Sequence, residues 1–177
     1  MRLRALLGLD DARPPARRDR LVAAVRAELA DLAPARAELV AAFAGLLVRI
    51  AHADLEISDA ERAALRELVA AHTGLGADES AAVAAIVAEH ATGVAGIDYA
   101  ALTAAFNEHA TVAEKEHLID CLYAIAAVGS PVTVVEDEEI RAVARALLLS
   151  QAQRIAVRSR YKEQLEVIQA LRRRRDG

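Results

Sequence analysis

The chain has 177 residues, of which 55% are hydrophobic and 3% aromatic, with a formal net charge of −4 at pH 7. This length fits one globular domain, and the wealth of Ala and Leu beside so few aromatic residues favours helices over strands. The single cysteine, Cys121, excludes an internal disulfide, and no uninterrupted apolar run reaches the roughly 20 residues that a membrane-spanning helix needs. No secretory signal pattern opens the chain, so we expect a cytoplasmic protein.

The first third of the chain predicts a loose arm and two helices. Residues 1–18 mix arginines with a Pro-Pro pair, so we expect a loosely ordered basic arm. A first helix is predicted over 19–32, ending before Pro34. A second is predicted over about 35–54, because apolar residues recur there at helical spacing. These are Leu39, Val40, Phe43, Leu46, Leu47 and Ile50.

The stretch "HADLEISDAER", residues 52–62, is crowded with acidic residues at the junction of two helices. Ser58 and Glu61 form the S-x-x-E pattern of a capping box, in which each side chain binds a backbone N–H at the start of a helix. That helix is predicted to run to about residue 72, where "TGLG" provides a glycine cap. Asp78 is then predicted to cap a helix that reaches about residue 91.

The second half of the chain predicts four more helices, about eight in all. One covers 98–109, and a second capping box, Thr111 with Glu114, opens the next. A helix follows over 136–149, and Ser150 with Gln153 starts a last one. We therefore expect a compact all-α domain over 19–171, with a basic tail, "RRRRDG", over 172–177.

Charge is strongly segregated along the chain. Residues 1–51 carry nine Arg against six acids, residues 52–139 carry three basic groups against seventeen acids, and residues 140–177 carry ten basic groups against three acids. The acidic middle would attract cations, and the basic ends could reach phosphates or anionic surfaces. Charge runs are also typical of solvated faces.

An internal duplication is predicted when residues 46–65 are laid over 121–140. Both segments read as an apolar helix, a tight polar turn, an aliphatic residue, a hydroxyl cap and a glutamate three positions later. In this register Ser58 meets Thr133, and Glu61 meets Glu136. The pattern predicts two halves related by a pseudo-twofold axis.

The two turns resemble a known family. "AHADLEISDAERAALREL" is similar to the A-D-G-x-(I/V)-(S/T)-x-x-E turn that occurs twice in the TerB (tellurite-resistance protein B) family, including the TerB-like domain of DjlA-type co-chaperones. The stretch from "FNEHATVAEKEHLIDCLYAIAAV" to "ARALLLS" resembles the second half of that family. The resemblance covers roughly residues 38–165.

The resemblance implies a non-catalytic bacterial protein whose facing acidic turns bind a divalent cation, with Ca²⁺ as the preferred ion. It also implies a role in tellurite, metal or other stress responses through partner proteins, in the cytoplasm or at the inner membrane. Carried over by position, the metal ligands would be Asp54, Glu56, Glu61, Glu136 and Asp137. The chain departs from the pattern at Leu55, where the family has glycine. It departs again at Gly129, Ser130 and Pro131, which removes an acid from the second turn.

Alternative interpretations of these residues stay open. Asp54, Glu56 and Ser58 imitate the start of an EF-hand loop, but Asp59 stands where its glycine belongs and Leu65 where its bidentate glutamate belongs. Capping alone explains Ser58 and Glu61, and the helix dipole explains Asp59. Neither explains Asp54 and Glu56. His52, beside them, is a minor candidate for the same turn.

Other site chemistries find little support. Glu114 and His117 have the E-x-x-H spacing of di-iron bundles, but the sequence holds no second copy. Cys121 lies on an apolar helical face, which predicts a buried structural thiol. With few aromatic residues and no reader motif we expect no nucleic-acid binding, and with no catalytic fingerprint no enzymatic activity. The alternative to cation binding is a metal-free adaptor whose basic ends dock a protein or the inner membrane surface.

Overall fold

A computed structural model describes residues 17–50, 66–71, 75–90, 99–128 and 131–175. Within these ranges the chain is helical and contains no strand, which confirms the predicted all-α class. The helices are α2 (Arg17–Glu28), α3 (Pro34–Ile50), α5 (Ala77–His90), α6 (Tyr99–His109), α7 (Val112–Ala126), α8 (Val134–Ala146), α9 (Gln151–Arg160) and α10 (Glu166–Arg175). Residues 66–71 are also helical.

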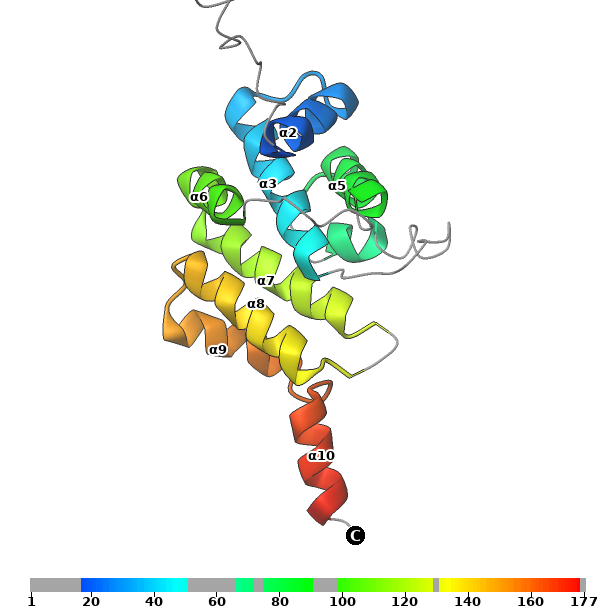
Figure 1. The fold of residues 1–177 in the computed structure, drawn as a ribbon, viewed down its shortest axis with the longest axis vertical. Coiled ribbons are helices and arrows are strands. Elements are labelled where there is room, and N and C mark those ends of the chain that lie inside the picture. Colours follow the sequence, from blue (N-terminus) through cyan, green and yellow to red (C-terminus); the bar gives the residue numbers. More distant parts are fainter. Residues whose placement is uncertain (1–16, 51–65, 72–74, 91–98, 129–130, 176–177) are drawn as a thin grey trace, which may run out of the picture.

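Helix α3 forms the centre of the fold and packs against α2, α5, α6 and α7 (Figure 1). Its residues 39–47 are all buried, because apolar or small side chains face neighbours on every side of the helix. Phe43 on α3 meets Phe106 on α6, with ring centroids 5.9 Å apart and the planes tilted by 55°. Among the described helices, none combines the length and the apolar content of a membrane span.

Helix α7 joins this centre to a second layer formed by α8 and α9, which lie side by side in Figure 1. One face of α8 is apolar and contributes Ile140, Val143 and Ala144 to the core. Helix α10 points away from the body (Figure 1).

Three capping boxes begin helices of this second half. Thr111 with Glu114 opens α7, Thr133 with Glu136 opens α8, and Ser150 with Gln153 opens α9. All three were predicted from the spacing of a hydroxyl residue and a Glu or Gln. The box predicted at Ser58 and Glu61, and the segment 46–65 of the duplication, fall largely outside the described residues. The pseudo-twofold relation therefore stays a prediction.

The prediction of a single last helix was wrong. The chain leaves the helix after Arg160 and re-enters one at Glu166, although no glycine or proline stands between them. In the break, Val132 N–H donates to the Gln164 carbonyl at 2.8 Å, and Glu166 N–H donates to the Val132 carbonyl at 2.9 Å. Val132 and Leu165 are both buried by this pairing. A tertiary contact overrides local helix propensity here.

Three further boundaries differ from the prediction. The helix predicted over 136–149 is α8, Val134–Ala146, which begins two residues and ends three residues early. The first helix ends at Glu28, four residues early, and Pro34 begins the next helix at a position where its missing N–H costs nothing. Asp78 does not cap α5 but lies in its first turn. Glu79 instead reaches back to the helix start, where its Oε2 accepts the Gly76 N–H at 3.0 Å.

Candidate functional site

The second of the two predicted turns ends in the capping box that fixes Glu136. The Thr133 hydroxyl accepts the Glu136 N–H at 3.2 Å, and Glu136 Oε2 accepts both the Thr133 N–H and the Thr133 hydroxyl at 2.8 Å. Both bonds to the cap use Oε2. The second oxygen, Oε1, is therefore the atom that Glu136 can offer to a cation.

The next residue, Asp137, has a different environment. Its Oδ1 accepts hydrogen bonds from the Tyr123 hydroxyl at 2.7 Å and from Arg158 Nε at 2.8 Å, and its Oδ2 accepts from Arg158 Nη2 at 2.8 Å. Asp137 is 8% exposed. Burial alone would raise the pKa of this carboxyl, but the bonds from Arg158 and Tyr123 outweigh burial and lower it. The carboxylate is ionised, and both of its oxygens accept hydrogen bonds from protein donors.

A similar group lies beside it. Arg160 Nη1 donates to Asp120 Oδ1 at 3.0 Å, and the Tyr161 hydroxyl donates to the Asp120 carbonyl at 2.9 Å. The Tyr123 and Tyr161 rings stack with centroids 5.3 Å apart and an angle of 19°. Two aspartates, two arginines and two tyrosines thus fasten α9 and the segment after it to α7 and α8.

Sequence reasoning missed this network. The resemblance adds Asp137 to the metal ligands because it follows Glu136, and nothing in it points to Asp120. A signal was available, because Asp137 stands one turn before Ile140 on the apolar face of its helix, and Asp120 stands between buried Ile119 and Cys121. An acid on an apolar face needs a cationic or hydrogen-bonding partner.

The first acidic turn, with Asp54, Glu56 and Glu61, lies outside the described residues, as does His52. Among the described residues no group of three or more His, Cys, Asp or Glu side chains could hold a metal ion. The described half of the predicted site therefore supplies one available carboxylate, that of Glu136.

A second ionic cluster, centred on Arg36 of α3, joins three helices. Arg36 donates to Glu79 of α5 through Nε at 2.6 Å and Nη2 at 2.8 Å, and to Glu114 of α7 through Nη1 at 2.6 Å. The hydrogen bonds from Arg36 to Glu79 outweigh the opposing effect of burial and raise the pKa of Arg36. The bond to Glu114 raises it further. The bond from Arg36 is also the main cause of the lowered pKa of Glu79.

Glu114 has two structural roles. Its Oε2 accepts the Thr111 N–H at 2.8 Å in the capping box, and its Oε1 holds Arg36. Burial would raise its pKa, but the bonds from Thr111 and Arg36 lower it. Both oxygens of the E-x-x-H glutamate are thus used by the fold.

Asn107, four residues before Thr111, also has a packing role, because its amide donates to the Ala146 carbonyl at 2.9 Å.

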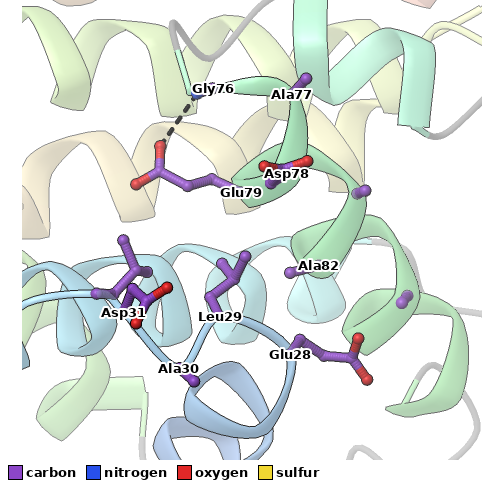
Figure 2. Close-up of a pocket in the computed structure, with 12 residues that line it drawn as sticks. Glu28, Leu29, Ala30, Asp31, Gly76, Ala77, Asp78, Glu79 and Ala82 are labelled. Atoms are coloured by element: carbon purple, nitrogen blue, oxygen red, sulfur yellow. Dashed lines mark hydrogen bonds between the residues drawn. The ribbon is translucent and has the colours of Figure 1, made fainter.

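An acidic cavity of about 750 Å³ opens between the end of α2 and the start of α5 (Figure 2). Glu28, Asp31, Asp78 and Glu79 contribute carboxylates to its wall, and Leu29 and alanines contribute apolar surface. In Figure 2 the carboxylates lie apart around the cavity rather than converging on one point. Glu79 is turned toward Gly76 in the same view.

Cys121 is a free, buried cysteine on α7, as its apolar neighbours predicted. Burial, helped by the charge of Asp120, raises the pKa of the thiol to about 12. The thiolate form, which is the nucleophile and the metal ligand, is therefore negligible at neutral pH.

Comparison with known families identifies the chain. The family model described as "Tellurite resistance protein TerB" matches residues 40–159, more than half of the sequence. The chain belongs to the TerB family. Searches of curated proteins and of solved structures found no match. The TerB match confirms the resemblance read from the sequence, and it spans both acidic turns, 52–62 and 129–136.

Proposed function

We propose that this TerB family member is a non-catalytic protein that binds a divalent cation and prefers Ca²⁺. The ligands are carboxylate oxygens of Asp54, Glu56 and Glu61 and Oε1 of Glu136. The match to the TerB model over both turns is the observation that supports this proposal. The acidic middle of the chain adds to it, because seventeen acids against three basic groups over 52–139 raise the local cation concentration.

The donor set suits a hard cation. Ca²⁺ takes six to eight oxygens from carboxylates, carbonyls and water, and the four carboxylates named here leave room for the others. Asp137 is left out of this set, since a cation would have to displace Arg158 from a bidentate pair and Tyr123 from a 2.7 Å bond. Arg158 and Asp137 neutralise each other, so this pair adds no net charge beside Glu136.

Calorimetric titration with Ca²⁺, Mg²⁺ and Zn²⁺ tests the binding proposal. We expect saturable heat and a rise in melting temperature with Ca²⁺ for the wild-type protein, and neither for Asp54→Ala, because an occupied site stabilises the folded state by mass action. The matched control is Asp78→Ala, which removes an acid from the first turn of α5 outside the proposed site. Absence of heat and of any melting shift for all three ions would remove the proposal.

The biological role that we propose is in tellurite, metal or general stress response, exerted through partner proteins. A bacterial host that lacks this chain should become more sensitive to tellurite, and wild-type protein should restore growth where Asp54→Ala does not. Equal rescue by both proteins would separate the stress role from cation binding. Affinity capture with and without Ca²⁺ would then test whether partners depend on the ion.

A second candidate function is a metal-free adaptor, and the Asp137–Arg158 pair is the observation that favours it. The fold itself neutralises one acid of the second turn. Helix α10 leads the basic residues 172–175 away from the body, where they could reach a protein or the inner membrane surface. This function predicts binding to anionic vesicles that falls with salt and with deletion of residues 172–177. Unchanged binding after both treatments would count against it.

A further inference from the structure

A basic recess of about 340 Å³ lies between α8 and α9. Its walls are formed by Arg141 from α8 and by Gln151, Arg154, Ile155 and Arg158 from α9. Three guanidinium groups thus border one small space, with an amide as a further polar group. Ile155 is 57% exposed and supplies an apolar border.

Each arginine is held in place by a contact within the protein. Arg158 uses Nε and Nη2 on Asp137, Arg154 donates from Nη1 to the Leu149 carbonyl, and Arg141 pairs with Glu138. A guanidinium carries five N–H donors, so each of the three retains donors that these contacts do not use. Arg154 and Arg158, whose bonds are part-buried, lose little further conformational entropy when they bind a ligand.

The charge balance of the recess favours an anion. Three arginines face two contacting carboxylates, those of Asp137 and Glu138, which leaves one net positive charge. Residues 140–177, which include α9, carry ten basic groups against three acids. The planar guanidinium fork matches the oxygens of phosphate in a two-point geometry.

We propose that the recess between α8 and α9 binds a phosphate group, either free or on a small organic molecule or lipid headgroup. Arg141 and Arg154 make the principal contacts, Arg158 adds charge from its place beside Asp137, and Gln151 adds an amide donor. The volume exceeds that of inorganic phosphate, so the group can carry a substituent, which Ile155 would border. This site uses none of the proposed cation ligands.

Titration with inorganic phosphate at constant ionic strength, followed by calorimetry and by NMR shifts of the arginine side chains, tests the site. Arg154→Gln and Arg141→Gln should each weaken binding by about tenfold, because each removes a charged fork. The matched control is Arg145→Gln, an exposed arginine of α8 that does not line the recess. It should change affinity by less than about twofold, since its charge acts through solvent.

Two further arms identify the source of the phosphate group. Methyl phosphate represents a soluble ligand, and phosphatidylcholine vesicles with and without phosphatidic acid represent a headgroup. Binding to either that is lost in Arg154→Gln supports the site and names its ligand class. Absence of saturable binding to all probes would overturn the proposal, as would equal losses in Arg145→Gln and Arg154→Gln with both variants folded by circular dichroism.

Discussion

The two ionic clusters described above have central residues of opposite charge, Arg36 in one and Asp137 in the other. In the Arg36 cluster a cation on α3 stands between carboxylates of α5 and α7, and in the Asp137 cluster a carboxylate on α8 stands between a tyrosine of α7 and an arginine of α9. The first has one positive charge for two negative ones, whereas the second is balanced. Both tie together helices that are distant in sequence.

This difference in charge determines which side chains lose their partner when the central residue of each cluster is substituted. Without Arg36, two acids whose side chains are 14% and 24% exposed would remain close together, each still held by its helix start. Without Asp137, a 35% exposed arginine and a tyrosine would remain, and the arginine could turn to solvent. A carboxylate pair without a counter-ion costs more than an arginine that water can reach.

Arg36→Met should therefore have the largest effect, a loss of about 3 kcal/mol in the free energy of unfolding at pH 7. This value is at the low end for a broken buried ion pair, because the Arg36 side chain is 32% exposed. Urea denaturation followed by circular dichroism measures it. Arg66→Met, which replaces an exposed arginine of the helical residues 66–71, is the control and should stay near wild type.

The pH dependence of this loss sharpens the comparison. The pKa values of Glu79 and Glu114 are lowered, so their contribution is fully present above the ordinary value of 4.5 and disappears as pH falls through the lowered values. The difference in free energy of unfolding between wild type and Arg36→Met should therefore narrow as the pH falls below 4.5. A gap that stays constant would mean that the arginine stem, and not its charge, carries the effect.

Asp137→Asn should cost less, about 2 kcal/mol, because the amide keeps the shape and can still accept one bond from Arg158 or Tyr123. Thermal and urea denaturation at pH 7 measure the loss. Glu138→Gln, one residue away and exposed, should lie within about 0.5 kcal/mol of wild type. If Asp137→Asn cost more than Arg36→Met, the proposed difference between the two centres would be wrong.

Tyr123→Phe should cost about 1 kcal/mol, the usual value for one buried hydrogen bond whose acceptor keeps other donors. Asp137 would retain both bonds from Arg158, and the stack on Tyr161 would persist. Tyr161→Phe is the matched comparison, since its hydroxyl binds a backbone carbonyl instead of a carboxylate. We expect the smaller loss for Tyr161→Phe, because a charged acceptor strengthens the bond in Tyr123.

The smallest effect is expected at the turn that brings α9 back along α8 and places Arg158 beside Asp137. Leu148 adopts a left-handed backbone conformation there, with φ of 61°, and its side chain is 78% exposed. Glycine adopts this conformation without steric cost. Leu148→Gly should raise the free energy of unfolding by about 0.5 kcal/mol, whereas Leu148→Val should lower it.

Local signals in the sequence predicted local structure well. The hydroxyl-to-Glu or Gln spacing located the starts of α7, α8 and α9, because a capping box is made within four residues. The all-α class followed from composition, and the TerB resemblance from the order of its motifs. The buried state of Cys121 followed from its apolar neighbours.

Contacts between distant residues were not predictable in this way. Arg36 binds acids 43 and 78 positions away, and Arg158 binds an acid 21 positions away, so no spacing rule connects them. The break after Arg160 depends on Val132, which lies far earlier in the chain. Asp137 was assigned to the metal set from its neighbour Glu136, but long-range partners decide what a buried carboxylate can bind.

The most direct test of the central claim, one cation shared by two turns, is a double-mutant cycle on Ca²⁺ affinity with Asp54→Ala and Glu136→Gln. Glutamine at position 136 can still complete the capping box with Thr133, so this change removes charge without removing the helix cap. We predict that each single variant loses most of the calorimetric Ca²⁺ binding and that the double variant loses little more. Wild-type affinity in Glu136→Gln would contradict the claim.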